Sequence, residues 1–465
     1  MERKITRNTQ EILVAILLFG LMFFASETFA QYQIGRTQIT FQDASRGNRS
    51  IQTEIYYPAS FAGNDVTIES GTYPVIVFGH GFVMAWDAYQ NLWEEFVPRG
   101  YIMVFPRTEG SIIGTDHQKF GWDLQFLVTQ MQIEGTTPTS IFYQGVANET
   151  ALMGHSMGGG AAFLAADSLV TNGNTNLKTL IGLAPAESSS NGVSSINSAL
   201  SVTVPSLILS GSNDGVTPPV DHHIPMYDNL ASDCKTFINV LGGGHCYFAN
   251  SNFNCDFGEG TASTGISITR EEQHEVMFDF VNLWLDYILK GDCNAFSEFN
   301  DSLQTSTRID YNQACTLNPI PIITDNSGDL TSSTTGVSYQ WYIDGSPIVN
   351  SDMQTITVTQ DGDYTVEVTY ANGCPETSDP YTVTTTSIVN YALKDFTIYP
   401  NPTKGIIMIT GIGLKNVEVQ LYNLVGELVS NYSIDNNKTI NLSTLPEGVY
   451  LLKINRIVKR VVLTK

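Results

Sequence analysis

The sequence contains few basic residues for its length. Of its 465 residues, 23 are Lys or Arg and 46 are Asp or Glu, so the formal net charge is −23. A nucleic-acid-binding surface needs clustered Lys and Arg side chains, because these neutralise the phosphate backbone. The composition therefore argues against a nucleic-acid partner. Acidic charge spread without long runs is instead typical of a protein that is soluble outside the cell.

Long hydrophobic runs are also scarce. One run, ILVAILLFGLMFFA at residues 12–25, follows a basic start that contains Arg3, Lys4 and Arg7. After it, Thr28 and Ala30 are small residues at the −3 and −1 positions of a cleavage site before Gln31. This pattern is typical of a secretory signal peptide. We therefore expect residues 1–30 to be removed and the mature protein, without a membrane span, to be exported. An uncleaved membrane anchor is the alternative, but the run is short for a span of about 20 residues.

Cysteine is sparse as well, with six residues and no C-x-x-C pair. This spacing does not favour a zinc or thiol-redox site, and we expect neither a metal nor an organic cofactor. Six cysteines fit an oxidising compartment, and their pairing is not determined by sequence. We expect a disulfide between Cys293 and Cys315, which flank the end of the first predicted domain.

Residues 31–300 alternate between apolar, strand-like runs and amphipathic, helix-like stretches. Continuous apolar runs such as YPVIVFGHG (73–81) and YIMVFPR (101–107) are typical of buried parallel strands. Amphipathic stretches lie between them, and EEQHEVMFDFVNLWLDYILKG predicts a long helix that ends at Gly291. Strands alternating with helices predict an α/β fold, in which a doubly wound, mostly parallel sheet is covered on both faces.

Residues 316–388 consist of short predicted strands with polar turns. Trp341 lies in the middle of one predicted strand, and Tyr364 lies in another. Val366, two residues after Tyr364, occupies the position at which an immunoglobulin domain has the second cysteine of its disulfide. The segment resembles an immunoglobulin-like or PKD-like β-sandwich without its own disulfide. Such a module usually spaces or presents a neighbouring domain, and binding of a carbohydrate or polymer is the alternative.

Residues 395–465 form a second predicted β-sandwich. The stretch YPNP at 399–402, GVY at 448–450 and the terminal KRVVLTK resemble the C-terminal sorting domain of the type IX secretion system of Bacteroidetes. The resemblance implies recognition by the type IX secretion machinery, transport across the outer membrane, and removal of the domain at the cell surface. The protein is then extracellular or attached to the cell surface. Another sandwich module is the alternative.

Three successive glycines follow Ser156 and Met157 in GHSMGGG (154–160). Glycine inside a helix costs up to about 1 kcal/mol relative to alanine, so this run indicates a close approach of the backbone. The first five residues match G-x-S-x-G, the nucleophile elbow, and they lie between a predicted strand (150–153) and a predicted helix (161–166). Ser156 is therefore the predicted nucleophile. A glycine-rich helix start with a capping serine is the alternative.

A serine nucleophile needs a base to take its proton and an acid to orient that base. In this fold the order along the chain is serine, acid, histidine. Asp214 follows the apolar run LILSGS, and His245 lies on a glycine-rich loop after a further predicted strand. Both residues stand just beyond the carboxyl end of a strand, where open α/β sheets place their sites. We therefore predict that Asp214 orients the base and that His245 is the base.

The other histidines and acids are weaker candidates. His155 lies inside the elbow and is expected to point away from the serine, and His80 is expected to be structural. His222 and His223 follow Asp214 closely, in a stretch predicted to be a polar surface. The remaining candidates are His117, which precedes the nucleophile, His274 on the final predicted helix, and Asp221 and Asp256, neither of which directly ends a strand.

The tetrahedral intermediate of acyl transfer needs backbone N–H donors for its oxyanion. The N–H of Met157, directly after the nucleophile, is one expected donor. The second is expected from the loop after VIVFGHGF, where Gly79 and Gly81 let the backbone turn inward, and Phe82 is the natural donor there.

Four segments together resemble one group of α/β-hydrolases: GHSMGGG, SVTVPSLILSGSNDGVTPP, IPMYDNL and GGGHCYFAN. The group is that of the cutinases and polyester hydrolases, including bacterial enzymes that cleave poly(ethylene terephthalate), and the resemblance covers about residues 31–292. It implies a secreted serine ester hydrolase that needs no cofactor and acts on esters or polyesters. Carried over, Ser156 is the nucleophile, His245 the base and Asp214 the acid. Phe82 and Met157 then form the oxyanion hole and flank the acyl group in an open cleft.

Two segments depart from this group. AESSS (186–190) stands where this group often has an aromatic residue, after the predicted strand that leads to AP (184–185). Glu187 is therefore expected near the substrate, where an acidic side chain weakens stacking of an aromatic polyester. The segment after His245 looks longer than in the group, and Cys246 and Cys255 are expected to pin it. A lipase and a chlorophyllase-like or feruloyl esterase are alternatives within the enzymes. A non-catalytic surface adhesin is the alternative of another class.

Overall fold

A computed structural model describes residues 32–187, 192–315, 317–384, 396–411, 417–434, 438–455 and 457–465. The predicted signal peptide lies outside the described residues. The described chain forms two compact units. The first runs to Tyr342 and includes Ser346–Ile356 and Thr365–Asp379, and the second contains Ile343–Gly345, Thr357–Tyr364 and the chain from Pro380 onward. The four-part division that the sequence suggests stays a prediction.

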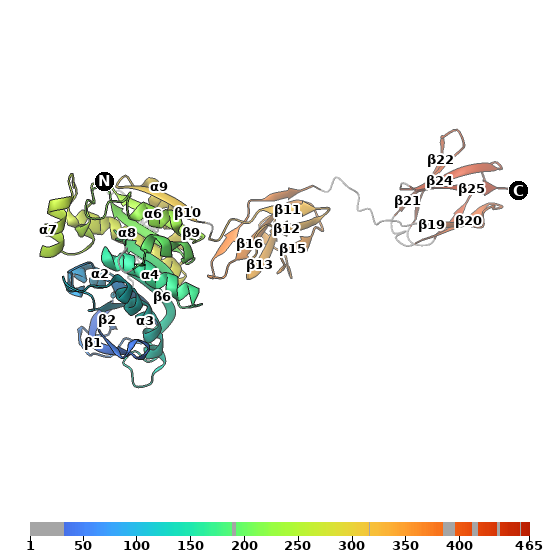
Figure 1. The fold of residues 1–465 in the computed structure, drawn as a ribbon. Coiled ribbons are helices and arrows are strands. Elements are labelled where there is room, and N and C mark those ends of the chain that lie inside the picture. The colour runs from blue at the N-terminus through green and yellow to red at the C-terminus, as the bar shows by residue number, and fades with distance from the viewer. Residues whose placement is uncertain are drawn as a thin grey trace, which may run out of the picture. The chain divides into compact units, whose positions relative to one another are not determined.

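A ten-stranded sheet forms the centre of the first unit (Figure 1), in the order β10-β9-β8-β7-β6-β4-β5-β2-β1-β3. The strands from β9 to β5 in this order are mutually parallel, whereas β10, β2 and β1 pair antiparallel with their inner neighbours. The bounds are β1 Gln33–Asp43, β2 Arg49–Ala59, β3 Gly63–Asn64, β4 Tyr73–Gly79, β5 Ile102–Pro106, β6 Val146–His155, β7 Leu177–Leu183, β8 Ser206–Gly211, β9 Cys234–Val240 and β10 Ile309–Cys315.

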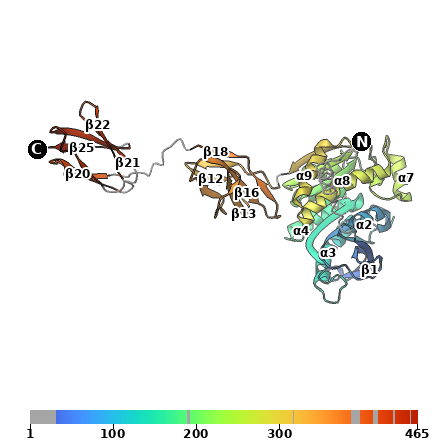
Figure 2. The same cartoon turned by 180° about the vertical axis from the view of Figure 1, so that it is seen from behind.

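Helices cover both faces of this sheet. Along β4, Val75 and Val77 belong to one core, whereas Ile76 and Phe78 belong to the other, because successive side chains of a strand point to opposite faces. Helices α2, α8 and α9 pack on the face of Phe78, and α3, α4 and α6 pack on the opposite face. Figure 2 labels α2, α3, α4, α8 and α9. The bounds are α2 Gln90–Phe96, α3 His117–Thr136, α4 Met157–Thr171, α5 Ser195–Ser198, α6 His223–Asn229, α7 Phe253–Ala262, α8 Arg270–Lys290 and α9 Cys293–Thr305.

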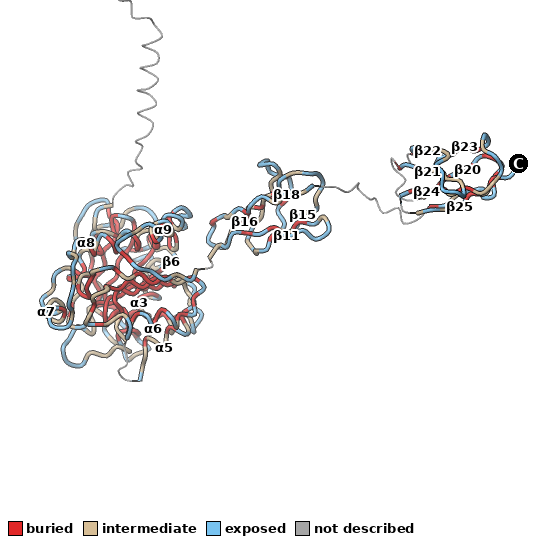
Figure 3. The backbone as a smooth tube through the Cα atoms, turned by 90° about the horizontal axis from the view of Figure 1, so that it is seen from above, coloured by how far each residue is buried: buried red, intermediate tan, exposed pale blue. Residues whose placement is uncertain are grey.

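The predicted α/β fold is confirmed, and Figure 3 shows its buried residues gathered around the sheet. Helix α8 ends at Gly291, whose φ of 70° is left-handed, as the sequence predicts. The sheet continues past residue 300, because β10 pairs with β9. Strand β10 is mostly exposed and polar, so it carries no hydrophobic signal that sequence reasoning could use. Among the described residues, no helix has the length and apolar character that crossing a membrane requires.

The C-terminal part of the described chain consists of antiparallel sheets. Trp341 is fully buried and donates a hydrogen bond from Nε1 to Met353 O, and Tyr364 Oη donates to Gln360 O, as in a tyrosine corner. The immunoglobulin-like identity stays a prediction. The strands are β11 Ile323–Asn326, β12 Asp329–Ser332, β13 Ser338–Ile343, β14 Ser346–Pro347, β15 Thr355–Thr357, β16 Gly362–Thr369, β17 Pro375–Thr377, β18 Tyr381–Val383, β19 Phe396–Tyr399, β20 Ile406–Gly411, β21 Val417–Tyr422, β22 Leu428–Ile434, β23 Lys438–Asn441, β24 Gly448–Ile454 and β25 Ile457–Leu463.

All six cysteines form disulfides, in the pairs Cys234–Cys315, Cys246–Cys255 and Cys293–Cys374. The predicted pair of Cys293 with Cys315 is therefore wrong. Register explains the difference, since Cys315 ends β10 directly opposite Cys234, the first residue of β9. The expected pinning of the segment after His245 by Cys246 and Cys255 is confirmed.

Candidate active site

Ser156 lies on a sharp turn between β6, which ends at His155, and α4, which begins at Met157. The serine has a φ of 54° and a ψ of −122°, a backbone conformation that L residues rarely adopt. A Cβ at Gly158 would lie 2.1 Å from the backbone of Gly79, so only glycine lets α4 approach β4 this closely. The glycine run therefore permits the compact turn that presents Ser156.

His245 and Asp214 lie within hydrogen-bonding distance of Ser156 and of each other. His245 Nε2 is 2.9 Å from Ser156 Oγ, and His245 Nδ1 is 2.8 Å from Asp214 Oδ2. Because a carboxylate only accepts, Nδ1 carries the hydrogen and Nε2 presents its lone pair to the hydroxyl. The structure thus brings together the three residues that the sequence singles out as nucleophile, base and acid.

The carboxylate of Asp214 is held in its ionised form. Oδ1 accepts hydrogen bonds from the backbone N–H of Val216 at 2.9 Å and of Thr217 at 2.7 Å. Burial opposes ionisation, but the neighbouring His245 and these donors outweigh it, so the pKa of Asp214 lies below its usual value. An ionised Asp214 keeps the His245 ring in the orientation that faces Ser156.

A buried polar chain extends behind Asp214. Thr217 Oγ1 lies 2.8 Å from Asp214 Oδ2, and His223 Nε2 lies 3.1 Å from Thr217 Oγ1. Ser210 Oγ lies 2.7 Å from His223 Nδ1. His223 is fully buried, so the predicted surface position of this residue is wrong. Burial lowers the pKa of His223 to about 3, so its ring is neutral at ordinary pH.

Glu259, on α7, binds the backbone of the loop that carries His245. Its Oε1 accepts a hydrogen bond from the N–H of His245 at 2.5 Å, and its Oε2 accepts one from the N–H of Cys246 at 2.8 Å. The side chain is almost fully buried. Sequence reasoning missed Glu259, because nothing in the local pattern of an acidic, glycine-containing stretch marks it as buried. Cys255, on the same helix, adds a covalent link to this loop through Cys246.

Exposed apolar side chains lie on the loops that follow the carboxyl ends of the parallel strands. Phe253 and Phe257 on α7 are 83% and 66% exposed, and their rings stack with centroids 6.3 Å apart. Asn254, between them, donates from Nδ2 to the carbonyl of Val83, next to the exposed Phe82. Further exposed apolar residues on these loops are Ile112, Ile113, Val216 and Val220. Exposed apolar side chains therefore lie on segments that follow the carboxyl ends of the parallel strands, as Ser156 does.

The two expected oxyanion donors lie on neighbouring segments. Met157 is the first residue of α4, so its N–H has no acceptor within the helix. Phe82 lies in the turn directly after β4, the strand whose Gly79 contacts Gly158 of α4. Both segments therefore border Ser156, and the assignment of the two N–H groups as oxyanion donors stays a prediction.

Glu187 lies after β7 and is half-buried. Its carboxylate accepts a hydrogen bond from the N–H of Ile196 at 2.8 Å, and its own N–H donates to His222 Nδ1 at 2.9 Å. These contacts hold the side chain on its own loop. A direct contact between Glu187 and substrate stays a prediction.

Among the described residues, no hydrogen bond joins the remaining candidates to the side chains of Ser156, Asp214 or His245. His80 is buried between the carbonyls of Gly81 and Thr108, which fits a structural residue. Asp256 pairs with Arg270. The others are His117, the first residue of α3, His274 on α8, and the exposed Asp221. Within the described residues, no group of three or more His, Cys, Asp or Glu side chains is arranged to hold a metal ion.

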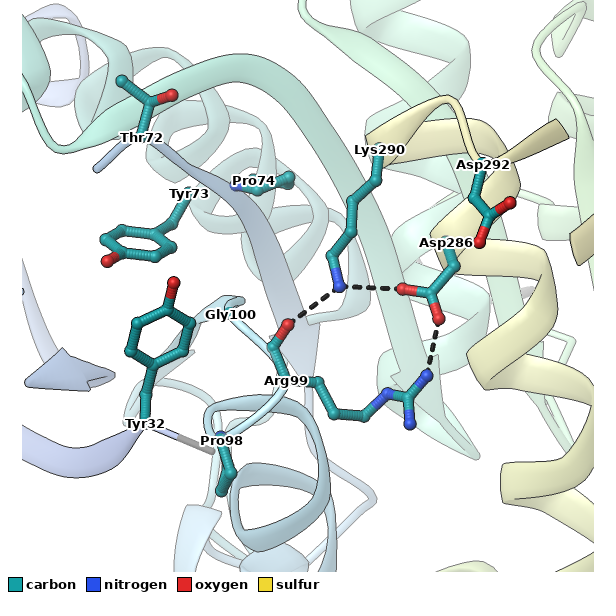
Figure 4. A pocket seen from close by; sticks show the side chains of 10 residues that line it. All are labelled: Tyr32, Thr72, Tyr73, Pro74, Pro98, Arg99, Gly100, Asp286, Lys290 and Asp292. Atoms are coloured by element: carbon teal, nitrogen blue, oxygen red, sulfur yellow. Dashed lines mark hydrogen bonds and ion pairs between the residues drawn. The ribbon is translucent and has the colours of Figure 1, made fainter. Parts of the chain in front are cut away.

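A cavity of about 580 Å³ lies at the end of the strands opposite to Ser156 (Figure 4). Its lining includes Tyr73, the first residue of β4, so it opens at the amino ends of the strands. Arg99 and Lys290, which also line it, both pair with Asp286. The cavity is therefore separate from the Ser156 region, which follows the carboxyl ends.

Two family models match the chain. The model described as PET hydrolase-like matches residues 26–267, and the secretion system C-terminal sorting domain matches residues 397–464. The second match indicates type IX secretion and a location at the cell surface or outside the cell.

Curated relatives of the first part are cutinases at low identity. Cutinase est1 of Thermobifida alba is 24% identical over 194 residues, and Cutinase 1 of Thermobifida cellulosilytica is 26% identical over 192 residues. The cutinase of Thermobifida fusca (strain YX) is 26% identical over 192 residues. Each alignment covers 41% of this chain and 56%, 64% and 56% of the respective relative, so the chain spans less than two thirds of their length.

Proposed function

This chain belongs to the PET hydrolase-like family, and on that premise we propose that it hydrolyses carboxylic esters through an acyl-enzyme on Ser156. The observation that carries the proposal is the contact of His245 with both partners, 2.9 Å from Nε2 to Ser156 Oγ and 2.8 Å from Nδ1 to Asp214 Oδ2. Serine hydrolases use this arrangement to make a serine hydroxyl nucleophilic at neutral pH.

The reaction proceeds in two halves. Ser156 Oγ attacks the ester carbonyl carbon while His245 Nε2 takes its proton, and the protonated ring faces Asp214. The tetrahedral intermediate then expels the alcohol, which receives the proton from His245, and the acyl group remains on Ser156. Water repeats the attack with His245 as base, which releases the acid and restores the serine. The backbone N–H groups of Phe82 and Met157 stabilise the oxyanion in both halves.

Short to medium acyl esters and aliphatic polyesters are the proposed substrates. The exposed rings of Phe253 and Phe257 beside the Phe82 turn support a polymer surface as substrate, because exposed apolar clusters mark interaction sites. Poly(ethylene terephthalate) is proposed as a slower substrate. Ala186 offers no ring for stacking after β7, and the neighbouring Glu187 carboxylate is held by Ile196.

Hydrolysis of p-nitrophenyl butyrate tests the reaction. Ser156→Ala should abolish turnover and labelling by a fluorophosphonate probe, while circular dichroism shows an intact fold. Turnover that persists in Ser156→Ala refutes the assignment of the nucleophile. Absence of turnover and of labelling in the folded wild-type protein favours a surface adhesin. A preference for long acyl chains with interfacial activation identifies a lipase instead.

A paired surface variant tests the polymer proposal. Phe253→Ser with Phe257→Ser should reduce adsorption to, and product release from, polycaprolactone film by about tenfold, with p-nitrophenyl butyrate turnover within about twofold of wild type. Val349→Ser with Met353→Ser is the matched control, because both side chains are exposed and lie on a different segment. Equal loss in both variants, or unchanged film hydrolysis in the first, contradicts a polymer contact at α7.

A further inference from the structure

Two fully buried polar side chains, Tyr89 and His155, have no part in the reaction described above. They lie in one continuous series of hydrogen bonds. The N–H of Gly81 is 2.8 Å from Tyr89 Oη, Tyr89 Oη is 2.8 Å from His155 Nδ1, and His155 Nε2 is 2.9 Å from the carbonyl oxygen of His245. The series starts beside the expected oxyanion donor and ends on the base.

The chemistry of the two ends determines the direction of this series. A backbone N–H can only donate and a carbonyl oxygen can only accept, so Gly81 donates to Tyr89 and His155 Nε2 donates to His245. His155 Nδ1 is then unprotonated and accepts the Tyr89 hydroxyl hydrogen. Met84 Sδ, 3.3 Å from Tyr89 Oη, is a weaker acceptor than this nitrogen. With the hydrogen of His155 on Nε2, every donor and acceptor in this series therefore has a hydrogen-bond partner.

Burial keeps both side chains in these forms. It lowers the pKa of His155 to about 3, with a smaller effect of His245 in the same direction. It also raises the pKa of Tyr89 far above its usual value. A neutral imidazole and an un-ionised phenol therefore persist across the pH range in which an esterase of this type works.

The series joins three separate parts of the site. Gly81 directly precedes Phe82, His155 directly precedes Ser156, and the carbonyl that it binds belongs to His245 itself. The contact at Gly81 is close, since a Cβ there would lie 3.2 Å from Tyr89 Oη. A displacement of about 1 Å between reacting groups can cost about a hundredfold in rate, so a fixed spacing of these parts matters.

We propose that Tyr89 and His155 are positioning residues that hold the Gly81–Phe82 turn and the His245 backbone at a fixed spacing on either side of Ser156. This inference rests on the proposed ester hydrolysis. It assigns both side chains an effect on the transition state, through the oxyanion donor and the base, with little effect on binding of the ground-state substrate.

Tyr89→Phe tests the proposal, because it removes one hydroxyl and keeps the ring. Turnover of p-nitrophenyl butyrate should fall at least tenfold in kcat with KM within about twofold. Affinity for phenylboronic acid, which forms a tetrahedral adduct on the serine, should fall by a similar factor. Tyr101→Phe is the matched control: Tyr101 is also fully buried, and its hydroxyl donates to Asp286 at 2.7 Å beside the separate cavity. It should keep kcat within about twofold.

Two results would overturn the proposal. One is a Tyr89→Phe enzyme with kcat and boronic acid affinity within twofold of wild type. The other is an equal loss of kcat in Tyr89→Phe and Tyr101→Phe that follows their loss of thermal stability, which indicates a merely structural role.

A double-mutant cycle with His155→Met provides a second measurement. If the hydroxyl acts through the imidazole, Tyr89→Phe should lower kcat clearly less in the His155→Met background than in wild type. An equal loss of kcat from Tyr89→Phe in both backgrounds would contradict an action of the Tyr89 hydroxyl through His155. Fluorophosphonate labelling of Ser156 in the wild-type protein separates these outcomes from failure of the proposed function, which would abolish labelling in every variant.

Discussion

The backbone N–H of His245 donates a hydrogen bond to Glu259 Oε1 over 2.5 Å, although the two residues lie on different segments. Oε2 of the same carboxylate accepts from Cys246 N–H, and Asn254 on the same helix donates to Val83. Helix α7 thus contacts both the loop of the proposed base and the turn that holds the proposed oxyanion donor.

Glu259→Gln should destabilise the protein by about 1–3 kcal/mol and lower kcat. An amide has one acceptor oxygen for the two N–H groups, and its NH₂ faces a donor, so one buried N–H loses its partner. Chemical unfolding and p-nitrophenyl butyrate kinetics measure the two effects. Glu298→Gln, on the exposed face of α9, is the control and should change neither. Wild-type stability in Glu259→Gln would count against the role of this carboxylate.

Thr217→Val should lower kcat/KM by about tenfold or more, whereas Thr217→Ser should stay within about threefold of wild type. Valine has the shape of threonine but lacks the hydroxyl, which lies 2.8 Å from Asp214 Oδ2. A hydrogen bond to a charged group contributes about 1.5–3 kcal/mol, and its loss frees the carboxylate to move relative to His245. Steady-state kinetics of the two variants decide the matter, and equal losses would show that side-chain packing rather than the hydroxyl matters.

Acidification should destabilise the fold through His155 and His223. Burial lowers the pKa of each from 6.5 to about 3. Above pH 6.5 both rings are neutral in the folded and unfolded chain, but between about 6.5 and 3 only the unfolded chain binds the protons. The free energy of unfolding should therefore fall with falling pH, by up to about 1.4 kcal/mol per pH unit for each histidine.

Urea unfolding between about pH 7 and pH 4 measures this slope. His223→Gln removes one titrating ring, so its slope should be shallower than that of wild type by up to the contribution of one histidine. An unchanged slope in this variant would mean that His223 does not titrate on unfolding.

Removal of the Cys246–Cys255 disulfide should affect turnover more than removal of Cys293–Cys374. The first bond lies next to His245 and joins residues nine positions apart, so Cys246→Ala with Cys255→Ala should lower kcat and cost about 2–3 kcal/mol of stability. The second lies at the start of α9, away from Ser156. Cys293→Ala with Cys374→Ala should therefore keep kcat. The reverse order of kcat losses would contradict the importance of the α7 link.

Much of the fold was predictable because its signals are local. The parallel strands are continuous apolar runs, and the glycines around Ser156 reflect a turn that no other residue permits. The position of β10 was not predictable, because this exposed antiparallel edge strand has no alternating apolar face that the sequence would show. The family resemblance read from the elbow and the later strand ends is confirmed by the PET hydrolase-like match.

The sequence by itself determined the strand ends that carry Ser156, Asp214 and His245. The apolar runs of the strands and the order of these residues along the chain are local features of the sequence. Only the tertiary structure decided which groups surround them. Tyr89 meets His155 across 66 positions, and His223 is buried although its flanking residues are polar. A hydrogen bond between distant segments leaves no periodic trace in the chain, and burial of a polar residue depends on what packs against it.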